Sequence, residues 1–310
     1  AQRRREHRTA LRESIGNKHE ATLAPAVEVV EVGGGRGHGL RARRHIAKGS
    51  TLKTEAPLFR SPPDARASDN VAAFERLPPA ERAKILELAG NEGSAATEIG
   101  FDGEQLAFLR VLRTNSVALA DRGCAVYPTT CRANHSCQPN AALCTQANGH
   151  IRLQAIRAIA PGEEVLVSYI GEGELLRPTE RRQALLQNWG FTCDCTRCRG
   201  RDDTRGFICP ACGRATVHAH GTEQRWSACV SCGATPAPEA LRGAEEEWTQ
   251  HVAALRGPSA GPMAAAMHEG LVASAMGDAA SAPSPEGHWL AATLAGRAAE
   301  ELLRRGDAAA

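Results

Sequence analysis

The first half of the chain contains short runs in which apolar and polar residues alternate. "VEVVEV" (27–32), "GLRARRHI" (39–46) and "STLKTE" (50–55) show this period of two, and Gly-rich or Lys-Gly turns separate them. The pattern returns in "HIRLQAIRAI" (150–159) and "EEVLVSYI" (163–170), on either side of a Pro161-Gly162 turn. Alternation between turn signals is typical of half-buried strands, so these segments predict a β-rich domain of short strands.

Helical periodicity appears between the two groups of strands. "AAFERLPPAERAKILELAG" (72–90) and "EQLAFLRVLRTNSVAL" (104–119) place apolar residues three and four positions apart, which predicts a helical insert at about 60–120. From residue 238 the chain is Ala-rich, and two further stripes predict a small helical tail: Trp248, Val252 and Leu255, then Leu290, Leu294, Ala298 and Leu302.

These patterns predict a mixed α+β, β-rich fold. We expect a polar N-terminal arm at 1–25, a strand-rich domain with its helical insert at 26–192, a cysteine-rich module at 193–237 and a helical region at 238–310.

Composition narrows the class of protein. The net charge is +2, far from that of a protein that coats nucleic acid, and no apolar run reaches the ~20 residues of a membrane span. We therefore expect an intracellular protein, nuclear or cytoplasmic, without a membrane partner and without strong nucleic-acid binding.

Eleven cysteines are many for such a chain. In a reducing compartment, closely spaced cysteines hold metal more often than they form disulfides.

Four of the cysteines follow a zinc-ribbon pattern. Cys209-Pro-Ala-Cys212 and Cys229-Val-Ser-Cys232 each present two thiolates, and Gly213 and Gly233 permit a tight turn after each pair. Because all four positions of a tetrahedral ion are filled, the pattern predicts a structural zinc site.

A second group, "FTCDCTRC", offers three thiolates from Cys193, Cys195 and Cys198. Zinc without bound water takes four ligands, so one must come from elsewhere in the chain. The candidates are Cys124, Cys131, Cys137 and Cys144.

Four further blocks stand out in the sequence: "GRGHGLRARRHIAKGSTLKTEAPL" (35–58), "NHSCQPN" (134–140), "GEEVLVSY" (162–169) and "NWGFTCDCTRC" (188–198). In this order and spacing they resemble the SET-domain lysine methyltransferases, most closely their SMYD-like and fungal-type branch. The resemblance implies a SET fold with knot-like threading of the NHSC segment. It also implies that Cys137 joins Cys193, Cys195 and Cys198 on one zinc, which makes two structural zinc ions per chain.

The resemblance also implies roles for individual residues. Tyr169 matches the active-site tyrosine, and Trp189 would line the channel for the substrate lysine. The residues matched to binding of the cofactor, S-adenosylmethionine (SAM), are Arg36, Gly37, His38, Asn115, Asn134, His135, Tyr169 and Phe191.

The chain departs from the SMYD pattern at two places. Residues 59–123 contain no cysteine, so the MYND zinc finger of those relatives is missing there. Trp189 stands where many relatives carry tyrosine.

The function these signs indicate is a monomeric, SAM-dependent protein-lysine N-methyltransferase whose partner is a protein or peptide that presents a lysine. The alternatives are an inactive SET scaffold acting as a zinc-binding adaptor, and a methyltransferase for a non-protein amine. The sequence does not name the substrate.

Overall fold

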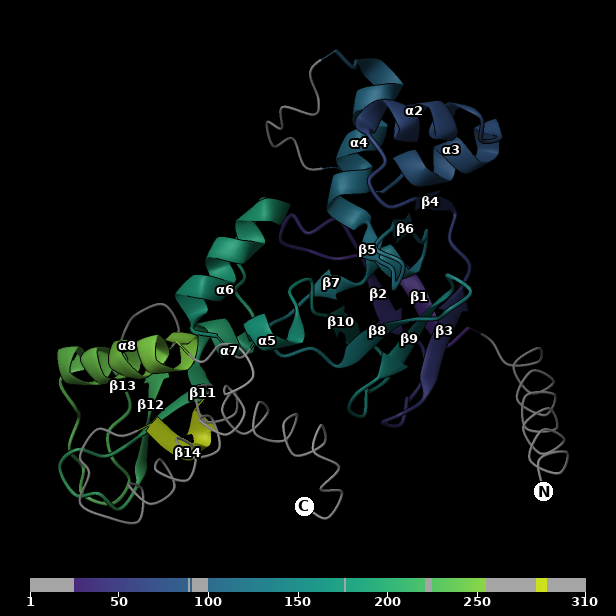
Figure 1. Ribbon diagram of the computed structural model, residues 1–310. Helices are drawn as coiled ribbons and strands as arrows, with labels where there is room; N and C mark the ends of the chain where they lie inside the picture. Colours follow the sequence, from purple (N-terminus) through teal and green to yellow (C-terminus); the bar gives the residue numbers. More distant parts are fainter. Residues whose placement is uncertain are drawn as a thin grey trace, which may run out of the picture. The chain divides into compact units, whose positions relative to one another are not determined.

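The computed structural model describes residues 25–88, 90, 100–175, 177–220, 225–254 and 283–288, and Figure 1 shows its ribbon. The described chain forms two compact units. The first comprises the described residues up to His135 together with Pro139–Val167. The second comprises Ser136–Gln138 together with the described residues from Ser168 onward. The polar stretch at 134–140 is therefore divided between the two units.

Short strands in small sheets form the body of the first unit. Its four-stranded sheet has the order β1 (Val27–Glu31), β2 (His38–Ala42), β10 (Glu164–Val167) and β7 (Asn134–His135). Two three-stranded sheets have the orders β3 (Thr51–Glu55), β9 (Ile151–Ala155), β8 (Ala141–Thr145) and β4 (Phe59–Ser61), β6 (Cys124–Val126), β5 (Val117–Ala118). The alternation in the sequence has its physical cause here: along β9, Ile151, Leu153 and Ala155 are buried and the residues between them are partly exposed.

The four-stranded sheet joins segments that lie far apart in the chain. β1 and β2 form an antiparallel hairpin, and β10 pairs antiparallel with the other edge of β2. β7 then pairs parallel with β10, placing Asn134 opposite Leu166 and His135 opposite Val167. This pairing brings the start of the NHSC segment to the strand that precedes Tyr169 in the chain.

The helical insert packs as a layer of its own. It contains α2 (Ala67–Glu75), α3 (Pro79–Leu86) and α4 (Gly103–Asn115); a short 3₁₀ turn, η2 (Thr130–Arg132), follows before β7. The rings of Phe74 and Phe108 stack with centroids 4.1 Å apart, and Phe59 meets Phe108 edge-on at 5.0 Å. Pro79 occupies the first turn of α3, where its missing N–H leaves no helical hydrogen bond unmade.

The second unit begins with short helices and continues into a small sheet. The helices are α5 (Glu172–Leu175), α6 (Thr179–Leu186), η3 (Gln187–Trp189) and α7 (Thr196–Arg199). The sheet has the order β13 (Arg225–Trp226), β12 (Thr216–His220), β11 (Arg201–Ile208) and β14 (Pro283–His288), and it is accompanied by α8 (Pro238–Ala254). Phe207, Val217, Trp226 and Leu241 form the buried core between this sheet and α8.

The predicted fold class is confirmed: the described chain is mixed α+β and strand-rich, with a helical insert and two cysteine-rich clusters. Within the stretch expected to be helical from 238 onward, α8 is a helix, whereas β14 is a strand on the edge of the sheet. An edge position tolerates the two prolines of β14 because one side of the strand needs no ladder hydrogen bonds. The predicted stripe at 290–302, Leu255 and residues 1–24 of the predicted arm lie outside the described residues.

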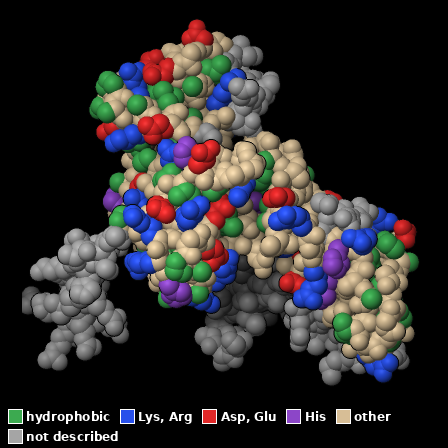
Figure 2. Space-filling model, turned by 180° about the vertical axis from the view of Figure 1, so that it is seen from behind, with side chains coloured by type: hydrophobic (Ala, Val, Ile, Leu, Met, Phe, Trp, Pro, Cys, Tyr) green, Lys and Arg blue, Asp and Glu red, His purple; other side chains and the backbone are tan. Residues whose placement is uncertain are grey.

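The surface mixes both signs of charge. Figure 2 shows acidic and basic side chains interspersed over the visible face of each unit. This distribution agrees with a net charge of only +2 over 310 residues. None of the helices in the described segments combines the length and the apolar character needed to cross a lipid bilayer.

Candidate functional site

A glycine-rich turn connects β1 to β2 and carries Arg36. Gly34, Gly35 and Gly37 all have positive φ, between 65° and 75°, which side chains with a Cβ rarely adopt. The turn closes with a hydrogen bond from Val32 N to Gly37 O at 2.8 Å. The Arg36 guanidinium reaches β10, where its Nη1 lies 3.2 Å and 3.0 Å from the two carboxylate oxygens of Glu164.

Glu164 is the centre of a polar cluster in the first unit. Asn134 Nδ2 donates to Glu164 Oε1 at 2.9 Å and to His38 O at 3.3 Å. Gly39 lies directly beneath this contact, since a Cβ at Gly39 would be 2.9 Å from Asn134 Nδ2 and 3.0 Å from Glu164 Oε1. The structure therefore brings three predicted cofactor residues, Arg36, His38 and Asn134, around one carboxylate; we call this the Glu164 cluster.

Sequence reasoning missed Glu164. It lies in the "GEEVLVSY" block, where it has the appearance of an ordinary polar position in a half-buried strand. Its contacts with Arg36 and Asn134 become visible only when β2, β10 and β7 are paired. No local signal singles it out, apart from the motif in which it stands.

Two further polar residues at 134–140, Ser136 and Asn140, hydrogen-bond backbone groups. Asn140 is fully buried; its Nδ2 donates to Glu164 O at 2.8 Å, and its Oδ1 accepts from Leu166 N at 2.8 Å. His135, also predicted to bind the cofactor, is buried in β7. In the sequence this stretch has the appearance of a surface loop, yet His135, Ser136, Cys137 and Asn140 are buried, and the Asn140 amide takes the place of a ladder partner for β10.

Asn115 occupies the last position of α4. Its Nδ2 donates to Val111 O of the same helix at 2.9 Å, and its carbonyl accepts from the Cys131 thiol at 3.1 Å. These bonds are typical of a residue that ends a helix, and its contact with a cofactor stays a prediction.

The second unit brings together the three aromatic residues predicted for catalysis, cofactor stacking and the lysine channel. The centroid of the Tyr169 ring is 5.5 Å from that of Trp189 and 6.3 Å from that of Phe191, the latter in an edge-on contact. Gly190, with φ of 75°, reverses the chain between Trp189 and Phe191. All three rings are partly buried against a core that includes Leu186 and Cys137. We call them the Tyr169 cluster.

The first cysteine cluster comprises Cys137, Cys193, Cys195 and Cys198, whose sulfurs all lie within 4.8 Å of one another. Cys137 Sγ is 4.0 Å from Cys193 Sγ and 3.5 Å from Cys198 Sγ. Four sulfurs bound to a tetrahedral zinc at about 2.3 Å would be about 3.8 Å apart. The donor set and its spacing therefore fit Zn²⁺, with the fourth sulfur supplied from 56 residues upstream of Cys193.

The second cysteine cluster comprises Cys209, Cys212, Cys229 and Cys232. Its two halves have the same turn: Gly213 N donates to Cys209 O at 2.9 Å, and Gly233 N donates to Cys229 O at 2.8 Å. Sulfur–sulfur distances of 3.8 Å (Cys209 to Cys232) and 3.7 Å (Cys212 to Cys229) again match a tetrahedral tetrathiolate.

Each cluster contains a thiol that loses its proton readily. The pKa of Cys195 is lowered to about 5, chiefly because the neighbouring Cys137 thiol hydrogen-bonds its sulfur. The pKa of Cys212 is lowered to about 6, with the backbone hydrogen bond from Arg214 as the largest cause. Thiolates bind zinc and thiols do not, so these two sulfurs are suited to first capture of an ion.

The other candidate cysteines lie outside both clusters. Cys131 is held in the first unit by hydrogen bonds with Tyr127 N at 3.3 Å and Asn115 O at 3.1 Å. Cys144 contacts Gln154 at 3.9 Å across the β8–β9 pair, and Cys124 is in β6. Of the four candidates for the fourth ligand, the structure brings Cys137 to the trio.

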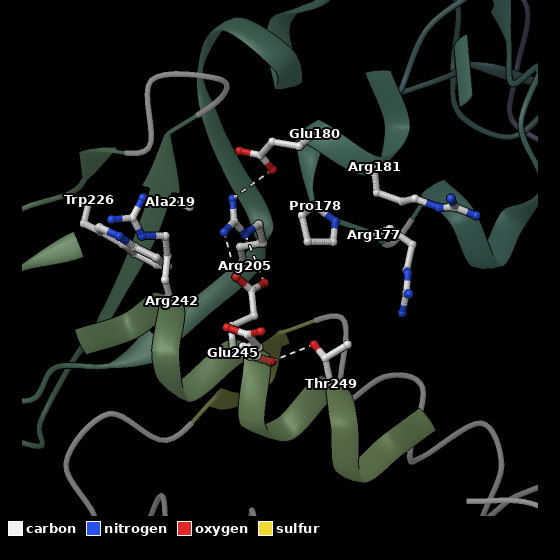
Figure 3. Close-up of a pocket in the computed structure, with 11 residues that line it drawn as sticks. Arg177, Pro178, Glu180, Arg181, Arg205, Ala219, Trp226, Arg242, Glu245 and Thr249 are labelled. Atoms are coloured by element: carbon white, nitrogen blue, oxygen red, sulfur yellow. Dashed lines mark hydrogen bonds and ion pairs between the residues drawn. The ribbon is translucent and has the colours of Figure 1, made fainter. Parts of the chain in front are cut away.

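A cavity of about 590 Å³ opens elsewhere in the second unit (Figure 3). Arg205 lies in its wall and is paired with Glu245 at 2.6 Å and with Glu180 at 3.8 Å, while its guanidinium lies over the Trp226 ring. The other lining residues are Arg177, Pro178, Arg181, Ala219, Arg242, Glu246 and Thr249. None of the predicted site residues lines this cavity. Three of its four arginines form ion pairs with glutamates: Arg181 with Glu174, Arg205 with Glu245 and Arg242 with Glu239.

Comparison with known proteins finds matches to the strand-rich part of the chain. Residues 37–170 match the family model described as SET domain. N-lysine methyltransferase SMYD2 of Homo sapiens is 40% identical over 91 residues, which is 29% of this chain and 20% of the relative. Histone-lysine N-methyltransferase SMYD3 of Mus musculus is 40% identical over 81 residues, 26% of this chain and 18% of the relative. The chain thus matches only about a fifth of the length of these curated relatives.

A solved structure from Plasmodium falciparum is 15% identical and covers 48% of this chain and 96% of its own, with a TM-score of 0.29 that supports no argument about fold. The predicted SET domain and the predicted resemblance to SMYD-type lysine methyltransferases are confirmed.

Proposed function

We propose that this chain is a SAM-dependent protein-lysine N-methyltransferase with two structural zinc ions. The observation that carries the proposal is the parallel pairing of β7 with β10 inside the SET domain. It places Asn134 next to Glu164, and the two strands lead, two residues further along the chain, to Cys137 and Tyr169. The names of the matched relatives, both lysine methyltransferases, support the same activity.

The Glu164 cluster has the chemistry to hold the amino-acid end of SAM. That end carries one carboxylate and one ammonium group. The Arg36 guanidinium suits the carboxylate, and the carboxylate of Glu164, His38 O and the Asn134 side chain offer acceptors for the ammonium. The glycines of the β1–β2 turn let the backbone approach the ligand closely.

The Tyr169 cluster has the chemistry to receive the lysine. Methyl transfer is an in-line displacement that needs a neutral amine aligned with the methyl group, so positioning and removal of water matter more than a strong base. Aromatic walls from Trp189 and the Tyr169 ring disfavour the ammonium form of the lysine by desolvation. The indole face also attracts a cation before its proton is lost, and the Tyr169 hydroxyl would orient the amine.

The two cysteine clusters would each hold one zinc as a closed tetrathiolate with no open position, which is a structural role. The partner is a protein or peptide that presents a lysine, and we expect a monomeric intracellular enzyme. Methylation keeps the positive charge of the lysine and changes its hydrogen bonding.

The decisive experiment compares Tyr169→Phe with Tyr127→Phe. Tyr127 is a matched control because it is the other tyrosine of the chain and its hydroxyl donates to Gly149 O at 2.6 Å in the core of the first unit. Transfer from tritiated SAM to a protein extract should fall about 100-fold in Tyr169→Phe, as when one transition-state donor is removed. The SAM affinity measured by calorimetry should change little. Tyr127→Phe should retain transfer.

Three outcomes would contradict the proposal. Equal labelling by wild type and Tyr169→Phe removes Tyr169 from the reaction. If the wild-type protein binds no SAM, the chain is an inactive SET scaffold that acts as a zinc-binding adaptor, the alternative that Trp189 favours. Labelling of small amines in place of protein identifies a methyltransferase for a non-protein amine.

A further inference from the structure

Two buried arginines surround the first cysteine cluster. The side chain of Arg182, in α6, is 0% exposed, and that of Arg197, in α7, is 10% exposed. Arginine is rarely buried unless its charge is paired and its donors are satisfied. Burial of two in the same small region therefore requires an anionic partner of matching charge.

Asp202, at the start of β11, supplies part of that charge. Its Oδ2 is 2.9 Å from Arg182 Nη1, and its Oδ1 is 3.0 Å from Arg197 Nε. Asp202 itself is fully buried. One carboxylate between two guanidiniums leaves one positive charge without compensation.

The first cysteine cluster supplies the rest. Arg182 Nη2 lies 3.9 Å from Cys198 Sγ, and Arg197 Nη1 donates to Cys137 O at 3.2 Å. A zinc ion with four thiolates carries a net charge of −2. The tetrathiolate thus needs nearby cations, and the arginines need a second anion, so each satisfies the other.

We propose that Arg182 and Arg197, aligned by Asp202, form a charged shell that determines how tightly the first cysteine cluster holds zinc. Arg182 acts on the sulfur of Cys198 by its charge, and Arg197 links the backbone of the upstream ligand Cys137 to α7, the helix that carries Cys198. Residues that support metal ligands in this way typically change metal affinity about 10- to 100-fold. The proposal depends on the zinc assignment above and is independent of methyl transfer.

The test uses the whole 310-residue chain loaded with zinc, and the second cysteine cluster is the internal reference. The protein is incubated with excess EDTA, thiols freed by zinc loss are trapped with N-ethylmaleimide, and each cysteine is followed by peptide mass spectrometry. Arg182→Met is compared with Arg181→Met, the adjacent residue on α6, whose side chain is 51% exposed and pairs with Glu174. Arg182→Lys tests whether the charge alone suffices.

In Arg182→Met, the cysteines of the first cluster should react about 10 to 100 times faster than in wild type, while those of the second cluster keep their rate. Arg181→Met should match wild type at both clusters. Arg182→Lys should accelerate the first cluster less than Arg182→Met does. If Arg182→Met does not fold, Arg182→Lys is compared with wild type instead. Lysine keeps the charge but lacks the planar guanidinium with its several donors, so the cysteines of the first cluster alone should still react faster than in wild type.

Two results would overturn the proposal: unchanged rates at the first cluster, or equal acceleration at both clusters, which marks general loosening of the second unit. Wild-type protein without zinc on the first cluster would overturn the zinc assignment itself. The wild-type zinc content therefore separates failure of the assignment from failure of this inference.

Discussion

Substitution Gly39→Ala tests whether the Glu164 cluster binds SAM. The new Cβ would lie 2.9 Å from Asn134 Nδ2, 3.0 Å from Glu164 Oε1 and 3.0 Å from Val32 Cγ1, distances that force these atoms to move. All three atoms are at the ends of side chains, so they can move without shifting the backbone. The bond that must open is the 2.9 Å contact between Asn134 and Glu164.

The expected effect is on affinity more than on stability. A hydrogen bond to a charged group contributes about 1.5–3 kcal/mol of free energy. If the Gly39→Ala protein loses one such bond in the SAM-bound state, its affinity for SAM should be about 10- to 100-fold weaker than that of wild type. Crowding of movable side-chain ends costs about 1 kcal/mol of stability. Alanine offsets much of that cost, since it is about 0.5–1 kcal/mol better than glycine within a strand. Calorimetric titration with SAM measures the first quantity, and thermal unfolding the second.

Gly49→Ala is the matched control with the opposite expected pattern. Gly49 lies in the turn before β3 with φ of 83°, and an added Cβ there would meet nothing within 4 Å. Left-handed backbone costs a residue with a side chain about 1–2 kcal/mol, so stability should fall while SAM affinity is unchanged. A Gly39→Ala protein that binds SAM within twofold of wild type, with an unchanged unfolding midpoint, would refute the role given to the Glu164 cluster.

Two further predictions concern the cysteines. Elemental analysis should find two zinc ions per wild-type chain, one in Cys137→Ser and two in Cys131→Ser. Cys131 is not a member of either cluster and is hydrogen-bonded to Tyr127 and Asn115 within the first unit. A single zinc in Cys131→Ser would contradict the ligand assignment. Burial raises the pKa of the Cys131 thiol to about 12, outweighing the hydrogen bond from Tyr127 N. Since the folded-state pKa is raised, the stability from this neutral thiol is present below the pKa of an unfolded-state thiol and lost as pH rises toward 12. At pH 8 the Cys131 thiolate should be about 1,000-fold scarcer than in the unfolded chain, and iodoacetamide should label it correspondingly slowly; labelling at the unfolded-state rate would refute the burial argument.

The sequence predicted those features that a few neighbouring residues encode. Alternation marked strands such as β1, β9 and β10, and helical spacing marked the insert that contains α2, α3 and α4. The two C-x-x-C pairs define two matching turns, since each pair needs only four residues and a glycine to form. The motif blocks were sufficient to predict the match to the SET-domain family model over residues 37–170, because the order and spacing of the blocks can be seen without any knowledge of the packing.

Tertiary structure decided which distant segments meet. The sequence left four candidates for the fourth sulfur of the first cysteine cluster, and only the fold of the second unit brings Cys137 to the trio. Glu164 and Asp202 appear in the sequence as ordinary acidic residues of strands, yet one gathers Arg36 and Asn134 and the other aligns two buried arginines. Strand β14 lies at the edge of a sheet in a region expected to be helical. Such pairings are the sum of many weak contacts between residues far apart in the chain, so no local pattern records them, whereas spacing within one turn or strand is written directly in the order of the residues.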